Sequence, residues 1–129
     1  MNDNQTVIVT RTRTFAEIHA QSVRSYIDTQ MDWAREKDIM KSYIGPEWEI
    51  CCTVSIAVSG IEREKREYAD AVAEYARSYP AEGEFAEVQQ EVIDRAIDEM
   101  DAYAVGAIAT IAKWAASVFD ARVATYARS

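Results

Sequence analysis

Apolar and polar residues alternate with a period of two between Glu47 and Ser59. One side of this segment carries the large apolar residues, and these are Trp48, Ile50, Cys52, Val54, Ile56 and Val58. The other side carries smaller or polar residues. Strict alternation is typical of a strand that is buried on one face and wetter on the other. The pattern therefore predicts a β-strand from Glu47 to Ser59.

A second strand is expected from Thr6 to Thr14, a segment rich in β-branched residues. Its alternation places Val7, Val9, Arg11 and Arg13 on one side. Two strands make only a marginal sheet, so helices must cover it or a second copy of the chain must extend it. The exposed strand edge favours a homodimer formed by strand pairing.

Helical patterns follow each predicted strand. Capping boxes of the type Ser/Thr-x-x-Glu begin at Thr14 and at Ser59, and they predict helices that start near Phe15 and Ile61. The first helix is expected either to break near Lys37-Asp38 or to continue until Gly45-Pro46 ends it.

A further helix is expected to begin near Glu84, after Pro80 and Gly83 have ended the preceding one. From Ala102 to Phe119 the chain is apolar on nearly every side, which is typical of a helix at the centre of a protein or at an interface. Lys113 and the many alanines of this segment favour a buried helix over a membrane-spanning one. The pattern leaves open whether the helix breaks near Gly106 or continues through it.

Together these elements predict one compact α+β domain over residues 1–129. The expected order is β-α-β followed by two or three helices. The two-stranded sheet is expected to lie beneath three to four α-helices, and strand pairing between two copies would extend it across a dimer. A chain of 129 residues with 49% hydrophobic content suits one domain with its own core.

Acidic residues are concentrated between Glu82 and Asp101. This segment holds 8 acidic residues and only one basic residue, Arg95, so it carries −7 of the formal net charge of −8. Six of its carboxylates recur at spacings of 3 and 4 residues and so share one helix face: Glu84, Glu87, Glu91, Asp94, Asp98 and Asp101. These six residues are called the acidic ladder below.

Two interpretations of the acidic ladder stay open. In the first, the ladder is a solvated face that an antiparallel preceding helix supports, with Arg77 near Glu87 and the Lys65-Arg66 pair near the far end. In the second, it docks on a basic partner protein, because carboxylates about every 5 Å imitate the charge of a nucleic-acid backbone. Small acidic proteins, many of them phage-encoded, block nucleic-acid-binding enzymes in this way.

The predicted function is a non-enzymatic protein-interaction module, an inhibitor or adaptor, with the acidic ladder as its partner-binding site. The chain shows no catalytic motif and no cofactor motif. Its net negative charge opposes direct binding to nucleic acid and adsorption to anionic membranes. The expected partner is a basic, nucleic-acid-binding protein, and a homodimer is a further expectation.

A metal-dependent enzyme is the first alternative. Glu64-x-x-Glu67 and Glu91-x-x-Asp94 resemble the E-x-x-E and E-x-x-D pair of the MazG-like nucleotide pyrophosphatases. The resemblance covers only these two helices. It implies four carboxylates that hold Mg²⁺, which in turn holds a nucleoside triphosphate. That family is all-helical, whereas two strands are expected here. A second alternative is an oligomer-forming structural protein that buries residues 102–119 between chains.

The few cysteines and the single histidine limit the remaining chemistry. Cys51 and Cys52 are adjacent and offer no disulfide or zinc framework, and Cys52 is expected to be buried with its strand. The N-terminus lacks the apolar core of a signal peptide, so a cytoplasmic location is expected. His19 is expected to pack beside Phe15 and Val23 in a structural role.

Overall fold

The computed structural model describes residues 3–37 and 47–128, and these residues form three α-helices and no strand. The helices are α1 (Asp3–Glu36), α3 (Glu47–Ser78) and α4 (Glu84–Arg128). Helix α4 has 45 residues, which makes it about 68 Å long.

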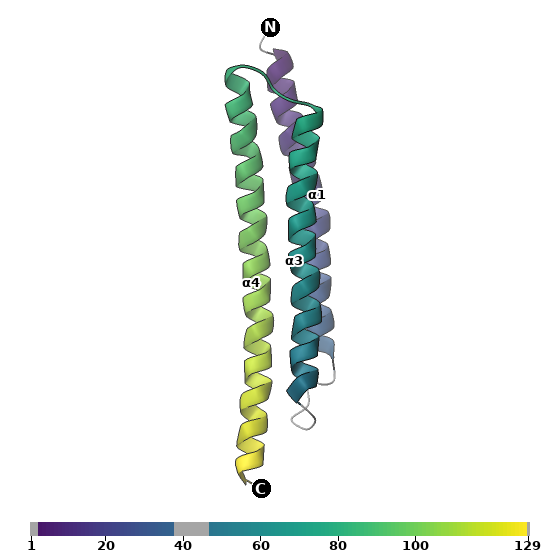
Figure 1. The fold of residues 1–129 in the computed structure, drawn as a ribbon, viewed down its shortest axis with the longest axis vertical. Helices are drawn as coiled ribbons and strands as arrows, with labels where there is room; N and C mark the ends of the chain where they lie inside the picture. Colours follow the sequence, from purple (N-terminus) through teal and green to yellow (C-terminus); the bar gives the residue numbers. More distant parts are fainter. Residues whose placement is uncertain (1–2, 38–46, 129) are drawn as a thin grey trace.

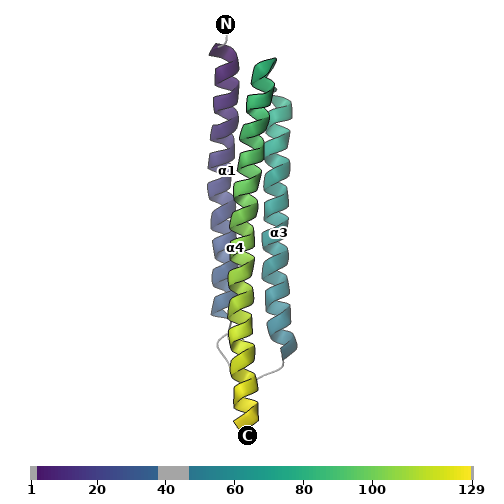
Figure 2. The same cartoon turned by 90° about the vertical axis from the view of Figure 1, so that its left-hand side faces the viewer.

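The three helices form an elongated bundle in which each helix contacts both others (Figure 1). Helices α1 and α4 run in the same direction, and α3 runs antiparallel to them. The C-terminal end of α4 extends beyond the neighbouring ends of α1 and α3, and the view in Figure 2 agrees.

The core runs along the axis of the bundle, where the helices present apolar residues three or four positions apart. Its largest completely buried apolar side chains come from all three helices, and they are Ile27, Ile61, Tyr68, Val72, Met100 and Ile111. The Tyr68 hydroxyl donates a hydrogen bond of 3.0 Å to the carbonyl oxygen of Ala16. This bond satisfies a polar group that would otherwise be buried without a partner.

The predicted α+β fold is wrong, and residues 47–59 show why. They form the first part of α3 and bury Ile50, Thr53 and Ala57, which follow helical spacing. Trp48 and Ile56, from the alternating apolar side, are 64% and 59% exposed. A short apolar run fits both periods. β-branched residues cost only about 0.7 kcal/mol or less each in a helix, so packing against α1 and α4 outweighs that preference.

The predicted strand at residues 6–14 is also wrong, because the segment belongs to α1. Val9 and Thr12 are buried. The Thr12 hydroxyl donates to the carbonyl oxygen of Ile8 at 2.9 Å, which satisfies this threonine inside a helix. Thr14 and Ser59 lie within helices, so neither capping box starts one. A homodimer through strand pairing is therefore contradicted, since residues 3–37 and 47–128 contain no strand.

The helix ends agree better with the sequence. Helix α1 ends at Glu36, beside the predicted break at Lys37-Asp38, while Gly45-Pro46 lies outside the described residues. Pro80 and Gly83 separate α3 from α4 as predicted, and Gly83 has φ of 59°, a backbone conformation that favours glycine. Helix α4 continues through Gly106 without a break.

The turn between α3 and α4 is held by the buried side chain of Gln89. Its side-chain oxygen accepts a hydrogen bond of 2.9 Å from the backbone N–H of Ala81. Its side-chain nitrogen donates to the carbonyl oxygen of Tyr79 and to the Thr12 hydroxyl, both at 3.0 Å. One glutamine thus ties the start of α4 to the turn and to α1.

The apolar second half of α4 does not lie at the centre of the bundle. The most apolar 18-residue window within Glu84–Thr125 has a mean hydropathy of 1.4, yet only 22% of it is buried. Length and composition would allow this helix to cross a membrane, a criterion that core helices of soluble proteins also meet. The exposure shows that the expected central helix leaves much of its apolar surface uncovered.

Candidate functional site

The acidic ladder lies along the first half of α4, on the side that faces away from α1 and α3. Five of its residues are exposed and Asp101 is half-buried. At about 3.6 residues per turn, the ladder falls opposite the buried side chains of Ile93, Met100 and Ala104. The sequence prediction that these carboxylates share one helix face is confirmed.

The ladder carboxylates form no ion pair with the basic residues that the structure describes. Arg77, which was expected near Glu87, pairs instead with Glu74 of its own helix at 2.8 Å. The antiparallel orientation of α3 and α4 is as expected, but Lys65 and Arg66 form no bridge to the ladder. Asp94 accepts a hydrogen bond of 2.9 Å from the Gln90 side chain, its neighbour on the same helix.

The outward face of α4 continues beyond Asp101 as an apolar surface. Its residues keep the spacing of 3 and 4, and they are Ala102, Val105, Ala109, Ala112, Ala116, Phe119 and Val123, called the apolar face below. All seven are exposed, and the three largest, Val105, Phe119 and Val123, are 61%, 40% and 52% exposed. One side of one helix therefore displays carboxylates first and apolar groups afterwards.

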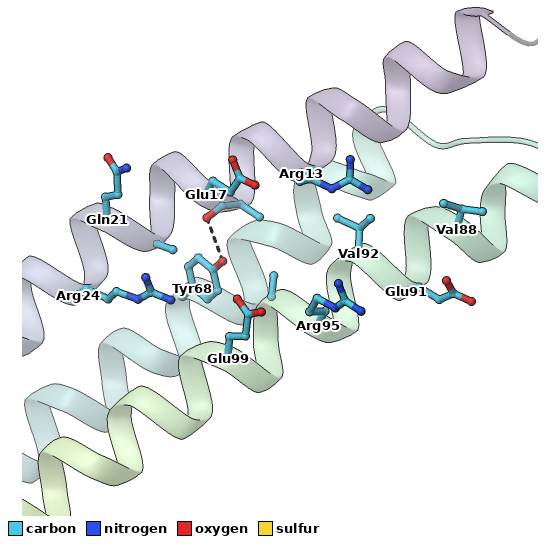
Figure 3. Close-up of a pocket in the computed structure, with 13 residues that line it drawn as sticks. Arg13, Glu17, Gln21, Arg24, Tyr68, Val88, Glu91, Val92, Arg95 and Glu99 are labelled. Carbon is cyan, nitrogen blue, oxygen red and sulfur yellow. Dashed lines mark hydrogen bonds between the residues drawn. The ribbon is translucent and has the colours of Figure 1, made fainter.

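A groove of about 560 Å³ runs between α1 and α4 beside the ladder (Figure 3). Its charged lining residues are of both signs: Arg13, Glu17 and Arg24 on α1, and Glu91, Arg95 and Glu99 on α4. Tyr68 of α3 lies at its floor, and burial raises the pKa of this tyrosine. Because its charges are mixed, the groove favours neither an anion nor a cation.

A tyrosine joins α1 and α4 further along the bundle. The Tyr103 hydroxyl donates a hydrogen bond to the Asp28 carboxylate, and this bond raises the pKa of Tyr103 above its ordinary value. The guanidinium of Arg24 lies 5.4 Å from the centre of the Tyr103 ring. These contacts fix the rotation of α4 and hence the direction in which its outward face points.

The alternative metal site is not assembled in the part of the chain that the structure describes. Glu64 and Glu67 lie on α3, Glu91 and Asp94 lie on α4, and no three acidic, histidine or cysteine side chains are grouped so that they could hold a metal ion. The Glu64 carboxylate lies 3.8 Å from the guanidinium group of the adjacent Arg63. The helical fold removes the mismatch with the MazG-like family, but the cluster of carboxylates that the resemblance implies is missing among these residues.

His19 and the cysteines show a prediction that holds and one that fails. The His19 ring stacks on Phe15 and on Tyr68 with centroid distances of 5.6 Å each, which agrees with a packing role. Cys52 was predicted to be buried with its strand, but α3 leaves both Cys51 and Cys52 exposed.

The sequence identified residues 102–119 as apolar and as a segment that an oligomer would bury, but it did not separate the exposed apolar face from the inward one. The 3 and 4 spacing from Ala102 to Val123 is visible in the sequence. It was hidden because the inward face, with Ala104, Ala107 and Ile111, is apolar too. Periodicity alone could not separate the two faces.

Comparison with protein-family models, curated proteins and solved structures finds no match for this chain.

Proposed function

We propose that this chain is a protein-interaction module that docks the acidic ladder of α4 on a basic surface of a partner protein. One observation carries the proposal: six carboxylates lie along one outward helix face, and no described basic side chain pairs with them.

The energetics of the ladder support a partner. Like charges three or four residues apart destabilise a helix by about 0.2–0.5 kcal/mol per pair. Neighbouring ladder carboxylates lie about 5 Å apart along the axis, within the Debye length of about 8 Å at physiological salt, so solvent ions screen their repulsion only in part. A basic surface would replace this repulsion by attraction over the whole ladder.

The shape of the ladder supports a partner that also binds nucleic acid. From Glu84 to Asp101 it extends about 26 Å along a helix that is packed against two others. A straight, regularly spaced row of negative charges resembles one strand of a nucleic-acid backbone, where phosphates follow each other at about 3.4 Å. The module would act as an inhibitor if it occupies the nucleic-acid site of its partner, and as an adaptor if it docks beside that site.

A charge-reversal pair tests the proposal. Glu91→Lys with Asp98→Lys reverses two of the six ladder charges, and Glu67→Lys with Asp70→Lys, at exposed positions of α3, is a control with the same change in net charge. In affinity capture from an extract of the native host, we expect the wild type and the control to retain the same basic protein. We expect the ladder variant to lose at least tenfold in affinity for it, a change of about 1.4 kcal/mol.

A competition experiment refines this test. Duplex DNA added to the captured complex is expected to release the partner if the ladder occupies a nucleic-acid site, and binding is expected to weaken as salt rises. Equal retention by the ladder variant and the α3 control would contradict the proposed function.

A further inference from the structure

We infer that the apolar face of α4 is a self-association surface on which the α4 helix of a second copy of this chain lies antiparallel. This inference concerns the apolar face that follows the acidic ladder, uses the ladder only to set the direction of the pair, and does not depend on the proposed function.

The exposure of the apolar face is the first reason. Val105, Phe119 and Val123 are large apolar side chains, each at least 40% exposed, and they lie on the same line as four exposed alanines. The face is about 32 Å long, and at a helix width of about 10 Å it covers about 300 Å², the lower end of the range for the largest apolar patch of a typical monomer, which is often functional. Lys113 flanks the face and can extend its ammonium group into water.

The spacing of the apolar face is the second reason. Seven residues at alternating intervals of 3 and 4 give an average repeat of 3.5 residues, which is the repeat of helices that pack side by side in a coiled coil. The alanines at 109, 112 and 116 lie in the middle of the face and allow two helix backbones to approach closely. The larger residues lie nearer its ends, and in an antiparallel pair Val105 of one copy comes near Phe119 of the other.

Charge complementarity identifies the occupant and its direction. The half of α4 from Glu84 to Asp101 is strongly acidic, whereas the exposed charged residues of the second half are Lys113, Asp120 and Arg128, and Arg122 is buried. A parallel pair would place two acidic ladders side by side. An antiparallel pair centred near residue 112 instead keeps the two ladders at opposite ends and brings Asp98 of one copy within about 3 Å, along the axis, of the level of Arg128 of the other. It also opposes the two helix dipoles favourably.

The interface is small. The apolar face supplies seven residues per copy, compared with about 20–30 per side in a standard stable interface. A reversible dimer that forms at micromolar concentration is therefore expected. In this arrangement the second α4 helix ends near Asp98, so the ladder from Glu84 to Asp94 stays accessible to another partner.

Sedimentation equilibrium tests the dimer. The wild type is expected to approach twice the chain mass of 14.6 kDa at tens of micromolar. Ala109→Glu with Ala116→Glu places four carboxylates in the interface and is expected to leave a monomer with unchanged helical circular dichroism. The control Ser22→Glu with Ser25→Glu adds the same charge at exposed positions of α1 and should dimerise like the wild type.

Three outcomes would overturn the inference. The first is a wild-type chain that stays monomeric up to hundreds of micromolar, and the second is an Ala109→Glu/Ala116→Glu variant that dimerises as well as the wild type. The third is a wild-type chain that is monomeric in buffer but floats with phosphatidylcholine vesicles, because the apolar face would then be covered by lipid.

Cysteine cross-linking tests the direction of the pair. In a Cys51→Ser/Cys52→Ser background, Ala102→Cys and Val123→Cys are expected to form a disulfide only when the two variant chains are mixed. Efficient cross-linking of either variant with itself would indicate a parallel pair and would overturn the antiparallel arrangement.

Discussion

Replacing Ile61 by alanine is expected to lower the free energy of unfolding by about 2–5 kcal/mol, because Ile61 is completely buried among all three helices and its removal leaves a cavity. Urea unfolding followed by circular dichroism measures the change. Ile56→Ala in the same helix is the matched control. Ile56 is mostly exposed, so its replacement is expected to change stability by less than about 0.5 kcal/mol.

Comparing the stability of Ile56→Ala and Ile61→Ala also distinguishes the helical fold from the strand that the sequence pattern indicates. In a strand over residues 47–59, Ile56 would be the buried residue and Ile61 would lie at the start of the next helix. A larger loss of stability from Ile56→Ala than from Ile61→Ala would contradict the helical register of α3.

Replacing Gln89 by leucine is expected to lower the free energy of unfolding by about 1–3 kcal/mol, the cost of leaving one buried polar group unpaired. That group is the Ala81 N–H in the turn between α3 and α4, whereas the Tyr79 carbonyl is only partly buried and can bond to water. Thermal unfolding of the variant measures the loss.

The neighbouring residue provides the control for this prediction. Gln90 is exposed and its side chain bonds only to Asp94, so Gln90→Leu is expected to change stability by less than about 0.5 kcal/mol. Similar losses from both variants would show that the Gln89 hydrogen bonds do not hold the turn.

The sequence predicted the acidic ladder correctly because charged residues at spacings of 3 and 4 fit only a helix. A strand would have sent Glu84 and Glu87 to opposite faces. The start of α4 was also predictable, since Pro80 cannot continue a helix and Gly83 adopts the left-handed conformation of a turn.

The fold class was not predictable in the same way. Residues 47–59 carry an alternating pattern and a helical pattern at once, and only the continuation of α3 into residues 61–78 and its packing decide between them. Gly60 lies between the predicted strand, which ended at Ser59, and the predicted helix, which began near Ile61. In the structure it is inside α3, where an added Cβ would lie 3.4 Å from the Gln30 side chain, an ordinary contact distance.

The ion pairs predicted for the ladder are not found among the described residues. The antiparallel direction of α3 and α4 does not determine how each helix is rotated about its own axis. Antiparallel packing does bring α3 beside α4, but Arg77 bonds to Glu74 on its own exposed side. The sequence alone does not give that rotation, because contacts between the helices set it. It depends on side chains such as Tyr103 and Tyr68, which bond to α1.

The outward face of α4 thus combines two surfaces on one rigid helix. The acidic ladder is proposed to meet a basic partner, and the apolar face is inferred to meet a second copy. An antiparallel dimer would present its two ladders at opposite ends, so one dimer could engage two basic sites. The affinity for a partner with two such sites would then be higher than that of one contact alone, because the second contact forms within the same complex.

Carboxylate labelling of the complex formed with the captured basic protein tests the docking of the ladder most directly. Carbodiimide and glycine ethyl ester are applied to the free chain and to the complex, and modified residues are quantified by mass spectrometry. We expect Glu87, Glu91 and Asp94 to lose most of their labelling in the complex, while Glu67 and Asp70 of α3 keep theirs. A complex in which the ladder is labelled as fully as in the free chain would contradict the proposed docking.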